Sequence, residues 1–218
     1  MTGRNNDRRW TGREAVWRYP KYWALCFIAS AISAVSAGTV EQAFILADPQ
    51  MQVKDGAVQG CGYRLKAIPQ SFDGRSPVLA LDASFNLYLG GIGLMKGGAI
   101  HSDFKDGKPQ PTTKPIENFW LKTQGDKPTS AANGKVLAAD TPGYLLYAAS
   151  VDSVLALYRS VADGTQLTVG VRLKGEGVDR IYSGVVQVSD ADRRQGMQCL
   201  GDLLREIEAA SPTSRPGK

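Results

Sequence analysis

The strongest fold signal in the chain is the stretch LALDASFNLYL, residues 79–89. Its apolar side chains recur at every second position, and the polar side chains of Asp82, Ser84 and Asn86 lie between them. A β-strand directs successive side chains to opposite faces of a sheet, so this alternation predicts a strand with one buried face. A helix would instead repeat its apolar positions every three to four residues.

Several shorter segments also have strand character. Residues 61–68 alternate in the same way, and residues 116–121 and 144–149 are short apolar runs with aromatic side chains. An alternating segment, residues 167–173, is followed by the turn Lys174-Gly175-Glu176-Gly177 and by a strand-like segment, residues 181–188. Residues 166–188 are therefore predicted to form an antiparallel hairpin.

Two helices are expected in the C-terminal third. The first starts at Ser150 or Asp152 and runs to about Val161, with an apolar face at helical spacing. The second follows Ser189, which pairs with an acidic residue three positions later as in a capping box, and runs to about residue 209. The predicted fold is therefore α+β: a largely antiparallel sheet of five to eight strands and two helices, with the C-terminal helix packed on the sheet.

Polar and proline-rich segments are expected to be loops. Residues 103–115 contain three prolines, and residues 123–135 include the turn signal Asn133-Gly134. Near the start of the domain, Asp48-Pro49 is expected to end a short strand or helical turn at residues 44–47.

The N-terminal segment has the pattern of a secretory signal peptide. Six basic and two acidic side chains precede a charge-free run from Tyr22 to Ala37, which ends in Val35-Ser36-Ala37. This predicts a signal peptide over residues 1–37, a single exported α+β domain over 38–210, and a disordered tail over 211–218. An uncleaved membrane anchor and a buried core helix are the alternatives, and the run is shorter than the roughly 20 residues that span a bilayer.

The basic character of the chain belongs mainly to this segment. Removal of residues 1–37 lowers the formal net charge from +5 to +1. A nearly neutral mature surface argues against a nucleic-acid partner.

The cysteines predict one disulfide bond. Cys26 lies within the predicted signal, which leaves Cys61 and Cys199 in the mature chain. An even number in an exported protein indicates a bond, whereas a reducing compartment would favour two buried thiols. No cofactor is expected, and no metal site, because two distant cysteines and the single histidine, His101, lack the paired short spacings of zinc ligands.

The sequence contains no recognisable set of catalytic residues. It lacks the Gly-x-Ser-x-Gly elbow of serine hydrolases, and a bonded cysteine pair supplies no nucleophile. The acids available for glycan hydrolysis are Asp73, Asp82, Asp103 and Glu117, of which Asp103 and Glu117 are the candidates for a wall-glycan hydrolase. His101 beside Asp103 is most simply a surface histidine at a strand end.

A glycine-rich stretch spans residues 90–98 and lacks the spacing of phosphate-binding loops. It is expected to be a flexible hairpin or bulge. Its apolar residues Ile92, Leu94 and Met95 form a candidate loop for docking a partner.

The C-terminal segment resembles that of a known group of exported proteins. The strand beginning Tyr182-Ser183-Gly184-Val185, followed by a helix with Cys199, Leu200 and Leu203, is similar to the ending of small exported bacterial proteins such as the invasion-associated periplasmic family. The resemblance covers the last quarter of the chain and transfers no functional residue.

These observations favour a non-enzymatic binding or assembly protein of a bacterial envelope, periplasmic or secreted. It would be an accessory part of an envelope or secretion machine, with another envelope protein as its partner and membrane contact only through the uncleaved precursor. A wall-glycan hydrolase and a periplasmic inhibitor or small-ligand carrier are the alternatives.

Overall fold

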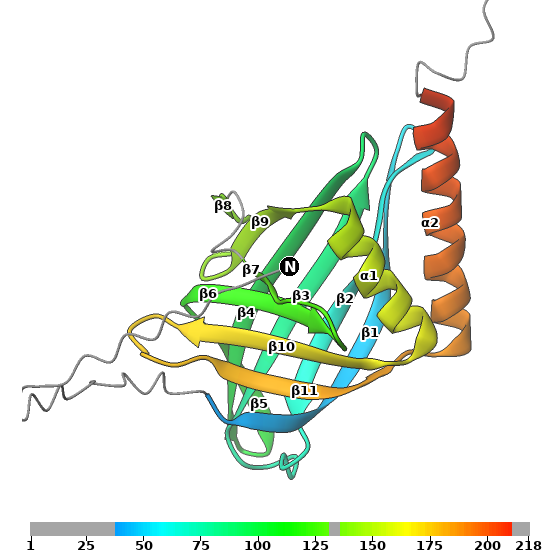
Figure 1. Ribbon diagram of the computed structural model, residues 1–218. Helices are drawn as coiled ribbons and strands as arrows, with labels where there is room; N and C mark the ends of the chain where they lie inside the picture. Colours follow the sequence, from blue (N-terminus) through cyan, green and yellow to red (C-terminus); the bar gives the residue numbers. More distant parts are fainter. Residues whose placement is uncertain (1–37, 131–135, 211–218) are drawn as a thin grey trace, which may run out of the picture. The chain divides into compact units, whose positions relative to one another are not determined.

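The structure is a computed structural model that describes residues 38–130 and 136–210 (Figure 1). The predicted signal segment, the predicted tail and the Asn133-Gly134 turn lie outside these residues. Within them the strands are β1 (Val40–Lys54), β2 (Ala57–Pro69), β3 (Val78–Tyr88), β4 (Ile92–Lys105), β5 (Lys108–Lys114), β6 (Ile116–Thr123), β7 (Thr129–Ser130), β8 (Val136–Leu137), β9 (Leu145–Ala149), β10 (Gln166–Leu173) and β11 (Arg180–Gln187). The helices are α1 (Val151–Asp163) and α2 (Asp190–Ala210).

The strands form one mixed, mostly antiparallel sheet. Its order is β7-β6-β10-β11-β1-β2-β3-β4-β9-β8, and β1 with β11 is the parallel pair. Strands β5 and β9 both pair with the same side of β4. Strand β9 pairs with residues 93–97 of β4, and β5 pairs with residues 99–105. The alternating stretch at residues 79–89 forms most of β3, which lies near the centre of the sheet between β2 and β4.

The predicted fold class is confirmed: the protein is α+β, its sheet is largely antiparallel, and α2 packs on β1 and β2. The sheet has eleven strands among the described residues, more than the five to eight expected. The additional strands come from short pairings and from segments whose polar composition concealed a strand.

Residues 103–115 are the clearest example, because the expected loop is the β4–β5 hairpin. Asp106 and Gly107 connect the two strands, and both have positive φ, 53° and 71°. Asp-Gly is a favoured pair for such two-residue turns. The β1–β2 hairpin turns in the same way at Asp55 (φ 53°) and Gly56 (φ 80°).

Pro49 does not end the first strand, contrary to expectation. Strand β11 pairs with β1 only as far as Leu46, so from Pro49 onward β1 pairs with β2 alone. Proline lacks the N–H needed for a second ladder, and a strand with one free side tolerates this.

The sheet curls so that β6, β10 and β11 cross the inner face of the long strands β1–β4 (Figure 1). The Tyr182 hydroxyl of β11 joins the two parts by donating to the Leu79 carbonyl oxygen at 2.9 Å. Helix α1 buries Val154, Leu157, Tyr158 and Val161 in the same core. Helix and inner sheet faces therefore enclose the apolar side chains together.

Helix α1 has the predicted start. The Ser150 side chain accepts a hydrogen bond from the Ser153 N–H, which satisfies one free donor of the first turn. Gly164 ends the helix in the left-handed conformation, with φ 60°.

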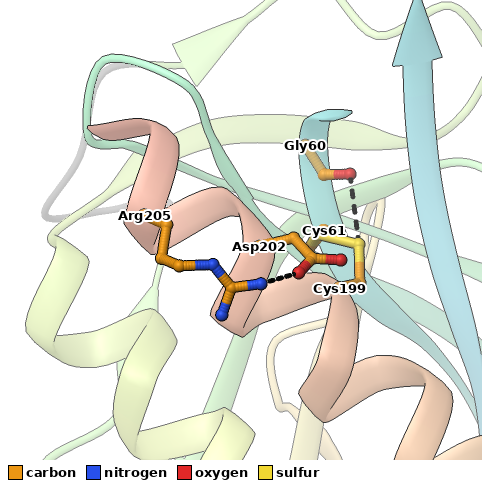
Figure 2. The surroundings of a disulfide bond; sticks show 5 residues. All are labelled: Gly60, Cys61, Cys199, Asp202 and Arg205. Atoms are coloured by element: carbon orange, nitrogen blue, oxygen red, sulfur yellow. Dashed lines mark hydrogen bonds and ion pairs between the residues drawn. A yellow bond between two sulfur atoms is a disulfide. The ribbon is translucent and has the colours of Figure 1, made fainter. Parts of the chain in front are cut away.

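Helix α2 is held to β2 by the predicted disulfide, Cys61–Cys199, whose Cα atoms lie 5.8 Å apart (Figure 2). Its close approach depends on Gly196, where a Cβ atom would lie 1.9 Å from the Tyr63 hydroxyl oxygen. The predicted cap is also present, since Ser189 Oγ accepts from the Asp192 N–H at 3.1 Å. In the described part of the chain, no helix combines the length and apolarity that crossing a membrane requires.

Candidate functional site

The outer face of β1–β4 carries polar side chains and is hollowed into a groove of about 560 Å³. This face is opposite the one on which the helices pack, because side chains alternate along each strand. In β3, for example, Phe85 and Leu87 are fully buried in the core and Asn86 lines the groove. The segment 138–146 forms the remaining wall.

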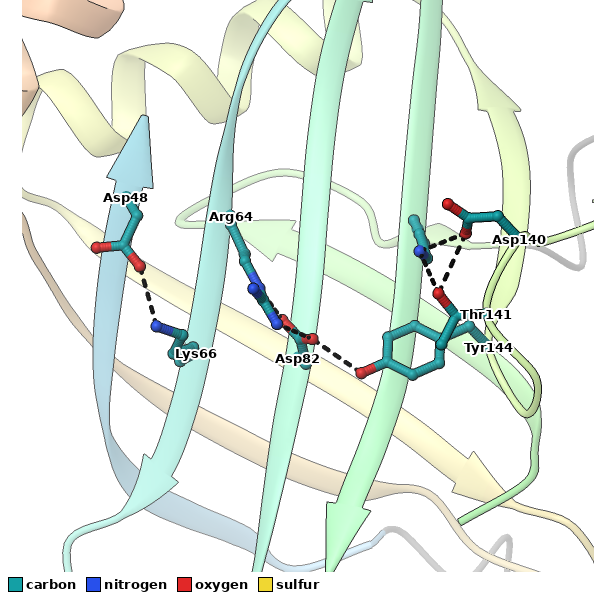
Figure 3. A network of polar contacts seen from close by, with 8 residues as sticks. Asp48, Arg64, Lys66, Asp82, Asp140, Thr141 and Tyr144 are labelled. Atoms are coloured by element: carbon teal, nitrogen blue, oxygen red, sulfur yellow. Dashed lines mark hydrogen bonds and ion pairs between the residues drawn. The ribbon is translucent and has the colours of Figure 1, made fainter. Parts of the chain in front are cut away.

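Asp82 is the centre of the polar network in this groove (Figure 3). Arg64 binds its carboxylate with two hydrogen bonds, Nε to Oδ1 at 2.8 Å and Nη2 to Oδ2 at 2.7 Å. The Tyr144 hydroxyl donates to Oδ2 at 2.8 Å. The Asp82 side chain is only 10% exposed, so these partners replace the water it has lost.

The same contacts set the ionisation of the neighbouring groups. The hydrogen bond to Asp82 raises the pKa of the Arg64 guanidinium. Burial, followed by the hydrogen bond to Asp82, raises the pKa of Tyr144 above its usual value. Tyr144 therefore remains a neutral donor at physiological pH.

Tyr144 reaches Asp82 because β4 has no side chain beneath the ring. A Cβ atom at Gly98 would lie 2.6 Å from three atoms of the Tyr144 ring. The ring thus lies against the strand at Gly98. Lys96 Nζ is 5.1 Å from the ring centroid, within the range of a cation–π contact.

Lys96 also forms the second ion pair of the groove. Its Nζ contacts Asp140 Oδ1 at 2.5 Å and Thr141 Oγ1 at 2.8 Å. The hydrogen bond from Lys96 lowers the pKa of Asp140. Each charged side chain that lines the groove, counted over the described residues, therefore has an oppositely charged partner, and the lining has no net charge.

Asn86 is an uncharged polar side chain in the same groove. It is 8% exposed, and its Oδ1 has no hydrogen-bond partner within the described residues. It lies over Gly62 of β2, where a Cβ atom would be 2.3 Å from Oδ1. Leaving a buried acceptor unpaired costs about 1–3 kcal/mol, so most such groups have a partner. This oxygen has almost no exposed surface and lies against Gly62.

The predicted docking residues Ile92, Leu94 and Met95 do not form a loop. They belong to strand β4, after a turn at Gly90 and Gly91. Because the strand alternates, Met95 lies in the core with no exposed surface, whereas Ile92 is 53% exposed and Leu94 lines the groove. The glycine-rich stretch is therefore part of a hairpin, as one of the two expectations had it, and the core position of Met95 leaves Ile92 and Leu94 as the residues nearer the surface.

Of the four candidate acids, only Asp82 lies in the groove. Asp73 organises a turn by accepting from the Arg75 and Ser76 N–H groups, which lowers its pKa. Asp103 contacts His101 Nε2 at 3.1 Å, and Glu117 is exposed on β6. The structure does not bring the hydrolase candidates Asp103 and Glu117 to this site.

Sequence reasoning recognised the polar face of β3 but missed the main partners of Asp82. Arg64 lay on the polar face predicted for residues 61–68, so its direction was available. The sequence places Tyr144 at the start of a short apolar run, and no sequence pattern relates it to Gly98, 46 positions earlier. Lys96 lies within the glycine-rich stretch, and no sequence pattern relates it to Asp140.

In residues 38–130 and 136–210, no group of three or more His, Cys, Asp and Glu side chains is arranged to hold a metal ion. Comparison with protein-family models, with curated proteins and with solved structures finds no match to this chain. The similarity of the C-terminal segment to the invasion-associated family therefore remains a resemblance. The fold and the groove define an α+β protein with a charge-balanced polar site on its sheet.

Proposed function

We propose that this protein is an exported bacterial envelope protein, periplasmic or secreted, with a non-enzymatic binding or assembly role. Its binding surface is the polar groove on the outer face of β1–β4. The observation that carries the proposal is the groove itself, a hollow of about 560 Å³ on the face of the sheet opposite the helices, with polar side chains from β1–β4 along it.

The disulfide bond supports an extracytoplasmic location for this role. Cys61 and Cys199 are bonded, and such bonds persist mainly in oxidising compartments. The predicted signal segment agrees with that location and lies outside the described residues.

The groove favours binding over hydrolysis. A glycan hydrolase needs one carboxyl group as a proton donor and a second as a base or nucleophile. In the groove both Asp82 and Asp140 are engaged by cations, and Asp82 also accepts from Tyr144. The carrier alternative uses the same site, because the groove volume falls within the roughly 300–1,000 Å³ of small-ligand pockets.

Photo-crosslinking in the native host tests the proposal. A photoreactive amino acid is placed at Gln50 or Leu94, which line the groove, and at the control position Glu206, exposed on α2. We expect a crosslinked envelope component from the two groove positions and not from Glu206. The same products from all three positions, or no product from the groove, would contradict a binding role for this surface.

A further inference from the structure

We infer that the groove binds a small molecule that carries one carboxylate group and an apolar body. This inference rests on the proposed binding function and specifies its ligand class. The carboxylate lies between Arg64 and Lys96, above Ser84, and the apolar body lies along the leucines beside Lys96. Three features of the lining carry the inference: the register of the basic side chains, the exposure of one acidic partner, and the apolar strip.

Arg64 and Lys96 belong to one row of side chains that crosses the sheet. Arg64 of β2 is directly opposite Ser84 of β3, and Ser84 is directly opposite Lys96 of β4. All three residues line the groove. The Cβ atoms of directly opposed residues are about 4.5–5.5 Å apart, so one small anion can reach both basic side chains and the hydroxyl group between them.

Arg64 keeps donors for a ligand while it binds Asp82. The two hydrogen bonds to Asp82 use one edge of the guanidinium, Nε and Nη2, and leave Nη1 for a second acceptor. The Arg64 side chain is 45% exposed, so a ligand can approach it. Because Asp82 already balances its charge, Arg64 contributes hydrogen bonds rather than a net charge.

Lys96 supplies the charge, because its acidic partner can be displaced. The Asp140 side chain is 83% exposed and belongs to the wall segment 138–146. Exposed ion pairs contribute little to stability, so Asp140 can turn to water when a ligand carboxylate takes its place at Lys96 Nζ. This exchange leaves one positive charge in the lining, which a single carboxylate neutralises.

An apolar strip adjoins Lys96 and specifies the rest of the ligand. Leu146 of β9 is directly opposite Lys96, and Leu94 precedes Lys96 by two positions on the same face of β4. Both leucines line the groove, as does Ala138. A ligand whose carboxylate is bound at Lys96 therefore places its next carbon atoms against apolar side chains. An inorganic anion cannot use this strip.

Calorimetric titration of the purified, disulfide-bonded protein with octanoate tests this inference. The controls are octanamide, which lacks the charge, acetate, which lacks the apolar body, and inorganic phosphate. We expect octanoate to bind about 10-fold more tightly than each control, because each control loses one kind of interaction. Chemical-shift changes on octanoate binding should be confined to β1–β4 and residues 138–146.

The two members of one ion pair separate a binding role from a structural role. Lys96→Gln removes the cation and should lower octanoate affinity about 10-fold. Asp140→Asn removes the competing carboxylate and should raise the affinity. Both variants break the same exposed pair, so both should leave the midpoint of urea unfolding near the parental value. Lys66→Gln, on the same strand as Arg64 and outside the groove, is the control and should retain the parental affinity.

Absence of octanoate binding would overturn the inference, as would equal binding of octanamide or unchanged affinity in Lys96→Gln. A loss of affinity in Asp140→Asn that matches the loss in Lys96→Gln would also overturn it, because the pair would then be structural. If groove positions still crosslink to an envelope component in any of these cases, only the ligand class is wrong. If groove crosslinking is also absent, the proposed function fails with it.

Discussion

Individual side chains determine which polar groups this sheet can bury. Asp82 is almost fully buried, and it depends on Arg64 and Tyr144 for all its described hydrogen bonds. Lys66 lies on the same face two residues along β2, and its ion pair with Asp48 is exposed. The two basic residues of one strand therefore differ in their importance for folding.

We expect Arg64→Met to destabilise the protein by about 2 kcal/mol or more, because the buried Asp82 carboxylate would lose its charged partner. Lys66→Met should cost about 1 kcal/mol or less, as is usual for surface pairs. The free energy of unfolding in urea measures both. Equal losses would show that Asp82 does not depend on Arg64.

A methyl group at Gly98 should also disturb the groove. Gly98→Ala places a Cβ atom 2.6 Å from the Tyr144 ring, so the ring must move and its hydrogen bond to Asp82 weakens. Overpacking of this kind costs about 1–3 kcal/mol. Gly177→Ala is the control, since nothing lies within 4 Å of its Cβ position. Urea unfolding should separate the two variants, and equal stability would refute the proposed packing.

At the scale of secondary-structure elements, the sequence predicted regular segments well and polar segments poorly. Strand β3 was recognised because apolar side chains occupy one of its faces and polar side chains recur on the other. Strand β5 was missed because it is an edge strand whose side chains are mostly exposed, so it has no apolar face to detect. The Asp106-Gly107 signal was present, but the three prolines that follow it favoured a loop.

The Cys61–Cys199 disulfide joins helix α2 to β2 across 138 positions of the sequence, so its contribution to stability can be measured. Replacing Cys61 and Cys199 by alanine opens a loop of 138 residues. The chain-entropy model predicts a loss of up to about 5 kcal/mol for a loop of this length, because the unfolded chain regains its freedom, and measured losses are typically about 2–5 kcal/mol. Urea unfolding with and without reductant measures this: the double variant should be insensitive to reductant, and the parent should become similarly unstable when reduced. A variant as stable as the bonded parent would contradict this role.

At the scale of the whole molecule, the groove is built from segments that are far apart in the sequence, and no local sequence pattern shows that they come together. Its floor requires the register of four strands, and its wall comes from residues 138–146, which lie across β4. The sequence indicated which face of β3 was polar. It did not indicate that this face was hollowed or that Tyr144 would cover part of it.

The buried and half-buried tyrosines predict a response of the whole molecule to alkaline pH. Burial raises the pKa of five tyrosines, reaching about 12 for Tyr182; the others are Tyr63, Tyr144, Tyr147 and Tyr158. Because the folded pKa values exceed the unfolded value of 10.0, their contribution to stability is complete below about pH 10 and is lost as the pH rises through the folded values.

Ultraviolet titration of phenolate absorbance, recorded together with circular dichroism, measures this response. These five tyrosines should ionise together with unfolding, well above the pH at which unfolded tyrosines ionise. Complete ionisation near pH 10 with the fold intact would contradict their burial.

The proposed function depends on the domain working outside the cytoplasm with Cys61 and Cys199 bonded. The intact mass of the protein from fractionated native cells, with and without reductant before alkylation, tests this most directly. We predict a chain in the envelope or secreted fraction that lacks about the first 37 residues. Its two remaining cysteines should resist alkylation until they are reduced. A full-length chain in the cytoplasm with freely alkylated cysteines would contradict the account.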